Sequence, residues 1–461
     1  MAEVTYNRLQ QDEMETFDLE VERGDALRFD APIPISRPPT SPRDLTYSSA
    51  YFFTFLGSSL VGFIHHSGFL RDSFVLYQRA GAWTDMLMVA TLFGTVIGFF
   101  LIFALYYPSL REVLLKHAVP FSIGAQVTVA IAAYIGLGPQ CWPLSLLVLA
   151  GACCDIVRYR ESVELASFTD ATLELAFQIL AEYDMTLLAV FCALAVVQTG
   201  LLLWWGVIFV GLLTEVHAAA ALLSMLVLGF AAYWTVQTFH AVVSTISGSC
   251  VLWYFLKGED VSLDSERRVA LYTQTALSSS LGSLCKGALL VPVSQLFLAA
   301  RHWSSSASQP PRSHAEGALR QMVRALTESL SHKLHHNNRL VYPIIGIYGQ
   351  TFTRASQDTD ASEGISIVLD GTTNFLIKSV STGATLIVLL VFAMSGRGDP
   401  SLPLFLFVSF YLILAGASLL VTAARAAVDT FSIAYTANPT LFARLSPVVF
   451  HRFVRAREAQ K

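Results

Sequence analysis

Long apolar runs recur along most of this chain and are separated by short polar segments. The stretch 84–138 alone contains two such runs. Each is long enough to cross a bilayer, because about 20 apolar residues form a helix of roughly 30 Å. Within hydrocarbon every backbone N–H and C=O group must be bonded internally, and a helix meets this requirement with its own residues. The pattern therefore predicts an all-α fold, a polytopic bundle of about ten transmembrane helices.

The lengths of the apolar runs and the polar residues between them place the expected helices. They are 48–66, 84–107, 117–137, 141–157, 185–213, 218–252, 271–299, 339–353, 372–395 and 401–424. The run near 339–353 has the fewest apolar residues. Pro343, Gly346 and Gly349 lie within it, so we predict a broken or re-entrant segment there.

Two stretches differ from the membrane-spanning pattern. In 162–184, apolar residues recur close to helical spacing with acidic residues between them. This arrangement predicts an amphipathic helix lying on the membrane surface. The stretch 300–338 is polar and basic, with a Ser/Pro-rich linker, and we expect a second surface helix after that linker.

The chain divides into a transmembrane domain and two tails. Residues 1–46 are polar, acidic and rich in proline, without the pattern of a cleavable signal peptide, and we expect a disordered cytosolic tail. The transmembrane domain is expected over 47–424, and the Arg-rich segment 425–461 is expected to be a cytosolic tail. The basic residues of 300–338 conflict with strict alternation of sides. The side on which this loop lies stays open, as does whether 339–353 spans the membrane.

Composition agrees with a membrane protein and argues against several functional classes. The chain is 54% hydrophobic and 14% charged, whereas soluble domains are about 25% charged. A net charge of -4 over 461 residues gives no indication of a nucleic-acid partner. The sequence shows no Gly-rich phosphate loop, paired-carboxylate site or nucleophile elbow. We therefore expect neither an enzyme nor a cofactor, and no use of ATP.

Charged side chains beside or inside the apolar runs are the first candidates for function, because a charge in hydrocarbon is costly and usually functional. Lys286 lies in the middle of SSSLGSLCKGALLVPVSQ, and Glu215 lies in the short turn between two expected helices. Both are candidate ion or coupling sites. For Lys286 the alternative is a side chain that faces a polar cavity or reaches the interface. His332, His335 and His336 lack a nearby carboxylate or cysteine, so no metal site is expected.

Aromatic residues inside the runs suggest a second kind of site. A quaternary ammonium ion has no N–H group to donate, so aromatic faces are its natural partners. Tyr233 and Trp234 lie deep in one run, and Tyr348 and Phe352 are four residues apart, which places them on one face of a continuous helix. Packing between helices is the alternative for these rings. The candidate ligand contacts are Tyr233, Trp234, Gln237, Tyr348, Phe352 and Trp204.

Four stretches of the chain resemble the choline transporter-like family of eukaryotic membrane proteins. They are YWTVQTFHAVVSTISGSCVLWYF (233–255), ALSSSLGSLCKGALLVPVSQ (276–295), YPIIGIYGQTFTRASQDT (342–359) and VDTFSIAYTANP (428–439). The chain departs from the family at Lys286, where Phe is frequent, and at Ala288, which replaces a second Ser. The large extracellular loop of many animal members is also missing after the first expected helix, as in the compact fungal and protist branch.

The resemblance implies a helical transporter for choline or a related amine such as ethanolamine. It would be a uniporter or an ion-coupled carrier, not driven by ATP, in the plasma membrane or an organelle membrane. Two alternatives stay open: the same fold carrying another small solute, and a membrane scaffold without transport. A midplane cavity lined by aromatic side chains would favour the transporter, and a bundle centre filled by side chains would favour the scaffold.

Overall fold

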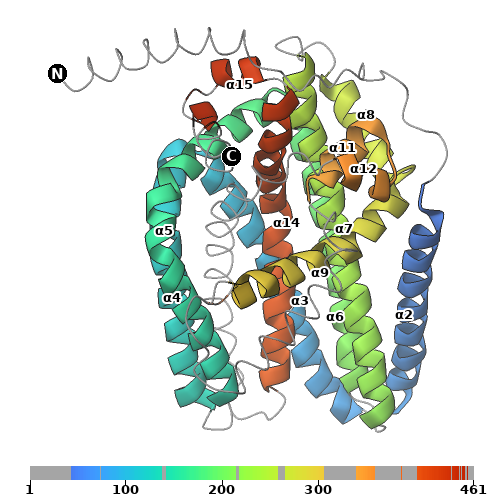
Figure 1. The fold of residues 1–461 in the computed structure, drawn as a ribbon. Coiled ribbons are helices and arrows are strands. Elements are labelled where there is room, and N and C mark those ends of the chain that lie inside the picture. The colour runs from blue at the N-terminus through green and yellow to red at the C-terminus, as the bar shows by residue number, and fades with distance from the viewer. Residues whose placement is uncertain are drawn as a thin grey trace.

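The computed structural model describes an all-α protein (Figure 1), as the apolar runs predict. The described residues are 43–72, 74–137, 142–213, 218–257, 265–305, 339–358, 402–437 and 439–445, with single positions at 386 and from 447 to 454. Within these ranges five helices are long and apolar enough to cross a membrane, or six if α8 and α9 form one span. The helix expected over 372–395 lies outside them except for Leu386, which is buried.

Two helices form the centre of the bundle: α7 (Ala218–Lys257) and α14 (Leu402–Ala437). Their apolar windows are 78% and 72% buried, whereas those of the other spans are 39–44% buried. In Figure 1, α14 runs through the middle of the molecule. The other helices that could span are α3 (Phe74–Tyr106), α4 (Pro108–Leu137) and α6 (Asp184–Leu213).

Small residues set the distance between α3 and α14. A Cβ atom added at Gly94 would lie 2.6 Å from the carbonyl oxygen of Ile413, and one at Gly416 would lie 2.9 Å from the backbone nitrogen of Thr95. Small residues that let backbones approach closely are typical of helix packing in membranes. The α3–α14 contact is therefore made largely of backbone.

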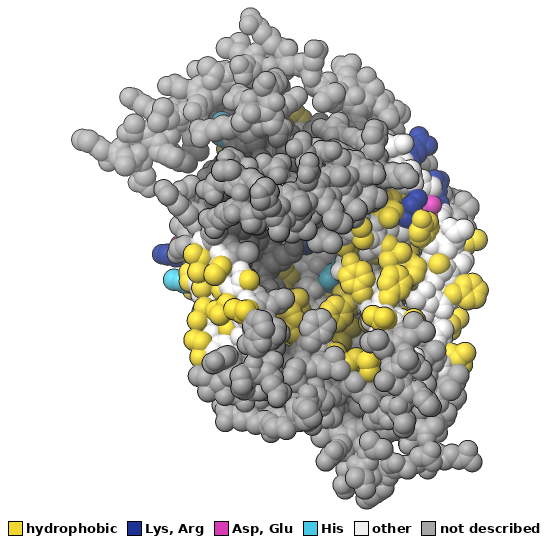
Figure 2. Space-filling view, turned by 60° about the horizontal axis from the view of Figure 1, so that its bottom comes forward, with side chains coloured by type: hydrophobic (Ala, Val, Ile, Leu, Met, Phe, Trp, Pro, Cys, Tyr) yellow, Lys and Arg dark blue, Asp and Glu magenta, His cyan; other side chains and the backbone are white. Residues whose placement is uncertain are grey.

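The outer side of α3 carries large apolar residues that no other described element covers. Phe93, Val96, Phe100 and Phe103 are 48–62% exposed, and their spacing of three and four places them on one helical face. Hydrophobic side chains cover much of the described surface in Figure 2, and the charged ones lie toward its edges. An apolar face this large is suited to lipid. The protein is an integral, multi-pass membrane protein.

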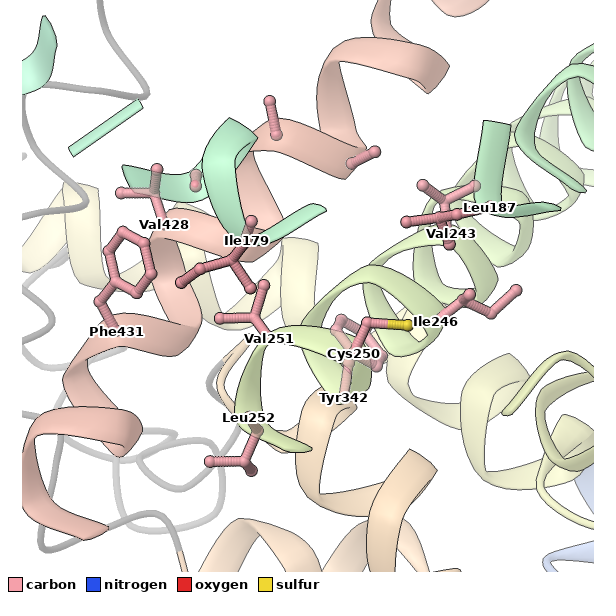
Figure 3. Packing of buried hydrophobic residues seen from close by; sticks show 14 of the residues in the cluster. Ile179, Leu187, Val243, Ile246, Cys250, Val251, Leu252, Tyr342, Val428 and Phe431 are labelled. Atoms are coloured by element: carbon pink, nitrogen blue, oxygen red, sulfur yellow. The ribbon is translucent and has the colours of Figure 1, made fainter. Parts of the chain in front are cut away.

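Helix α5 (Trp142–Ala181) joins two segments that the sequence pattern separates. The expected helices at 141–157 and 162–184 are one continuous helix, so the prediction of a separate surface helix is corrected. The apolar side of its second half packs into the protein core, where Ile179 belongs to the same buried cluster as Val251 of α7 and Phe431 of α14 (Figure 3). Its acidic side holds the buried Arg111 of α4 through Asp170.

A tyrosine at the end of α5 fastens this helix to α7. The hydroxyl of Tyr183 donates to the carbonyl of Cys250 at 2.6 Å. Burial raises the pKa of Tyr183 well above its usual range, so the hydroxyl stays protonated and keeps its role as donor.

Several helices are longer than their apolar runs. Helix α14 continues past 424 to Ala437 because Val428 and Phe431 are buried in the core and extend its apolar side. Helix α4 begins at Pro108, a residue that suits the first turn of a helix. Helix α2 covers Leu45–Asp72, and the short α15 covers Pro439–Leu445.

Two segments are broken. The span expected over 271–299 is bent by 70° between α8 (Ser265–Leu277) and α9 (Leu281–Ser305). At the break the Ser278 hydroxyl donates to the carbonyl of Gln274, a bond that commonly bends helices. The segment expected to be broken at 339–353 is confirmed as broken. There α11 (Val341–Tyr348) ends at Gly349, whose φ is 58°, and α12 (Phe352–Asp358) follows.

Candidate functional site

One face of α14 differs from the rest of this buried helix. Between 411 and 429 its partly accessible residues are spaced by three or four, and the residues between them are buried. Such spacing returns to the same side of a helix. Polar and charged side chains within a membrane span usually face the bundle interior or water. The residues of this face are Tyr411, Leu414, Ser418, Thr422, Arg425 and Asp429.

A similar face runs along α7. Tyr233, Gln237, His240 and Ser244 follow one another at helical spacing and are partly accessible in a helix whose other side chains are mostly buried. Two residues predicted from the sequence, Tyr233 and Gln237, therefore lie on one face. His240, which the sequence analysis did not select, extends that face by one turn.

The two faces meet. The ring nitrogen Nε2 of His240 and the hydroxyl of Ser418 share a hydrogen bond of 3.2 Å. We call the residues of these two opposed faces the α7–α14 face.

One ion pair lies within the α7–α14 face. The Nε atom of Arg425 and the Oδ2 atom of Asp429 are 3.7 Å apart, one helical turn from each other on α14. Both side chains keep part of their surface accessible, at 17% and 13%. A charged pair that is neither sealed from solvent nor exposed on the outside is suited to a polar passage between helices.

Two of the predicted aromatic residues lie elsewhere, against α2. Trp234 is 3% exposed, and its indole N–H donates to the carbonyl of Cys285 at 3.0 Å. Its ring packs edge-on against Tyr51 of α2. Trp204 is 42% exposed and lies 3.4 Å from the hydroxyl of Ser59, also on α2. The substrate contact that the sequence predicts for Trp234 and Trp204 is not tested by the structure. The contacts observed for both side chains are with α2 and, for Trp234, with the backbone of α9.

The remaining predicted residues gather at the break between α11 and α12. The ammonium group of Lys286 donates to the hydroxyl of Thr353 at 2.8 Å and lies 5.9 Å from the ring centre of Phe352. Tyr348 and Phe352 do not share a helical face as their spacing suggests, because α11 ends at Tyr348 and the left-handed Gly349 redirects the chain. Tyr348 is partly accessible, and Phe352 is buried.

Gly287 of α9 allows the rings of Phe352 and Tyr342 to pack closely against this helix. A Cβ atom at Gly287 would lie 2.8 Å from the Phe352 ring and 3.0 Å from the Tyr342 ring. The missing side chain therefore lets both rings approach α9. Tyr342 belongs to α11, which packs against α7, where the hydroxyl of Ser249 donates to the carbonyl of Pro343 at 3.2 Å.

Glu215, a predicted ion or coupling site, lies outside the described residues. So do His332, His335 and His336, for which no metal site is expected. In the part of the chain that the structure describes, no group of three or more His, Cys, Asp or Glu side chains is arranged to hold a metal ion.

A comparison with known protein families identifies the family of this chain. A family model described as plasma-membrane choline transporter matches residues 145–440, which is more than half of the chain. The matched region contains α7, α9, α11, α12 and α14, so it includes both faces described above. No curated protein sequence matches the chain. The chain belongs to the plasma-membrane choline transporter family.

Proposed function

We propose that this protein carries choline or a related amine such as ethanolamine across a membrane, and that the substrate passes along the α7–α14 face. The observation that carries the proposal is the partly accessible polar face between the two most buried helices. Membership of the choline transporter family supports the choice of substrate class.

The chemistry of the α7–α14 face suits a small organic cation. Rings of Tyr233 and Tyr411 offer π faces to a trimethylammonium group, for which hydrogen-bond donors and acceptors are of little use. Gln237 offers an amide to the hydroxyl group that choline and ethanolamine share. Asp429 supplies a carboxylate, and the neighbouring Arg425 limits its net charge. In the proposal the substrate is therefore held by rings and shape rather than by one strong ion pair.

The driving force follows from the charge of the substrate. The sequence has no phosphate-binding loop, and we propose uniport or ion-coupled transport without ATP. A membrane potential that is negative inside contributes about 2.3 kcal/mol per charge per 100 mV. This is enough to concentrate a monovalent cation without a second energy source.

Two alternatives to choline transport remain: transport of another small solute, and a scaffold without transport. Another small solute could use the same passage, and competition between substrates distinguishes this case. A scaffold without transport has no need of a polar, partly accessible face between its central helices, because apolar packing would hold the bundle equally well. The face therefore favours a transporter.

Substitutions at Tyr233 test the proposal directly. We expect Tyr233→Ala to weaken choline affinity about thirtyfold, because a cation–π contact with a desolvated cation contributes about 2 kcal/mol. Tyr233→Phe should retain most of the uptake, because it keeps the ring. Phe100→Ala is a matched control, since Phe100 lies on the exposed face of α3. A folded Tyr233→Ala protein with normal choline affinity would refute this site.

A further inference from the structure

A cluster of opposite charges and rings lies where the start of α2 meets both broken helices. It consists of the carboxylate of Asp44 and the rings of Tyr47 and Phe352, with the ammonium group of Lys286 among them. We call Asp44, Tyr47 and Phe352 the Asp44 cage. The side chains of Asp44 and Lys286 are 19% and 17% accessible, so the cage is neither sealed nor on the open surface.

The backbone around Asp44 is held in place by the break between α8 and α9. The N–H of Arg43 donates to the carbonyl of Ser279 at 2.9 Å. A Cβ atom at Gly282 would lie 2.2 Å from the carbonyl oxygen of Arg43, so only glycine allows this approach. Asp44 itself has a φ of 50°, a left-handed conformation that is uncommon for residues other than glycine. The surroundings therefore impose the position of its carboxylate.

Hydrogen bonds occupy one oxygen of this carboxylate. Its Oδ2 atom accepts from the hydroxyl of Ser283 at 2.7 Å and from the backbone N–H of Phe352 at 3.4 Å. The other oxygen, Oδ1, faces Lys286. One oxygen thus orients the carboxylate by contacts with α9 and α12, and the other is directed at a cation.

The distances around Lys286 fit a larger cation better than a primary ammonium. Its nitrogen lies 4.0 Å from Oδ1 of Asp44, and 5.4 Å and 5.9 Å from the ring centres of Tyr47 and Phe352. An ammonium that donates to a carboxylate comes within about 2.7–2.9 Å. In a quaternary ammonium ion the methyl groups make the contact, and a C–H···O distance of about 3.3–3.6 Å keeps the nitrogen about 4–5 Å from the oxygen. Lys286 instead donates to Thr353.

We propose that the Asp44 cage is a binding site for a methylated ammonium ion and that Lys286 is a tethered cation that occupies it when no such ion is bound. The cage lies next to Tyr342 of α11, a helix that packs against α7. The inference deepens the proposed function and rests on it for the identity of the natural substrate, since a choline-like cation would displace Lys286 before reaching the α7–α14 face.

Removing the tethered charge tests the cage. The probe is tetramethylammonium, and the readout is the thermal unfolding of the purified full-length protein, with sodium at equal concentration as the control. We expect Lys286→Met to bind tetramethylammonium at least about tenfold more tightly than the wild type, because the competing cation is absent. Adding Asp44→Asn to this variant should abolish the gain, because the carboxylate is then neutral.

A second variant keeps the test decisive if Lys286→Met does not fold. Thr353→Val removes the hydroxyl to which Lys286 donates and retains the lysine. The freed ammonium group can then approach Asp44 more closely and compete more strongly for the cage, so we expect tetramethylammonium affinity to fall. If Lys286→Met and Thr353→Val respond equally to sodium and tetramethylammonium, Lys286 only fastens α2 through Asp44, and the cage proposal is wrong.

The two proposals can fail separately. In one outcome the wild-type protein takes up no choline, but Lys286→Met binds tetramethylammonium and this binding depends on Asp44. That result would refute the proposed function and support the cage. In the other outcome the wild-type protein takes up choline, but Lys286→Met does not change tetramethylammonium binding. That result would refute the cage proposal and support the proposed function.

Discussion

Replacing Trp234 distinguishes packing from substrate binding on α7. The side chain is 3% exposed, donates to the carbonyl of Cys285 at 3.0 Å, and packs against Tyr51 with 5.5 Å between ring centres. Trp234→Phe removes that hydrogen bond, which contributes about 0.5–1.5 kcal/mol, and shrinks a buried ring. Trp234→Ala leaves a cavity, and such changes cost about 3–5 kcal/mol. We therefore expect Trp234→Ala to lower the free energy of unfolding more than Trp234→Phe does.

The assay pairs stability with transport. Thermal unfolding in detergent measures the loss of stability, and the concentration dependence of choline uptake at a temperature where both variants are folded measures affinity. Because the indole packs against α2 rather than lying on the α7–α14 face, we expect choline affinity to be unchanged. A stable Trp234→Ala protein with about tenfold weaker choline affinity would refute this reasoning and restore a direct contact between Trp234 and the substrate.

Two further predictions concern stability. We expect Gly94→Ala to lower the thermal unfolding temperature, because its Cβ would clash with the backbone of α14, whereas Gly124→Ala has open space and should be neutral or slightly stabilising; equal effects would contradict the α3–α14 contact. We expect Asp170→Asn to destabilise by about 3–5 kcal/mol because it leaves the buried Arg111 without its nearest carboxylate. Glu174→Gln should change the unfolding temperature much less, because Glu174 is 64% exposed, and the reverse order would contradict the proposed ion pair.

The apolar runs predict the helices of this protein well and their ends less well. Run length is enough to locate a helix that must bury its backbone in lipid. It does not reveal where a helix continues beyond the run, as α14 does when Val428 and Phe431 reach the core. The run 271–299 looks continuous by composition, and the contact that accompanies its break, from Arg43 to Ser279, joins residues far apart in the chain.

The candidate site was predictable only in part. Lys286 and Phe352 stand out in the sequence as a buried charge and a ring near a glycine. Asp44 does not, because its partner Ser283 is 239 residues away and the segment before it is polar. The spacing from Ser418 to Asp429 on α14 is visible in the sequence as polar residues at intervals of three and four. Apolar residues outnumber them, and the run is therefore identified only as a membrane span.

The central claim is that this protein moves a choline-like cation. The most direct test is uptake of radiolabelled choline into proteoliposomes that contain the purified full-length protein, without ATP, under a potassium diffusion potential that is negative inside. We predict saturable uptake that ethanolamine inhibits and that rises with the potential, since each 100 mV contributes about 2.3 kcal/mol per charge. Folded protein that gives no more uptake than protein-free liposomes at any potential would contradict the account.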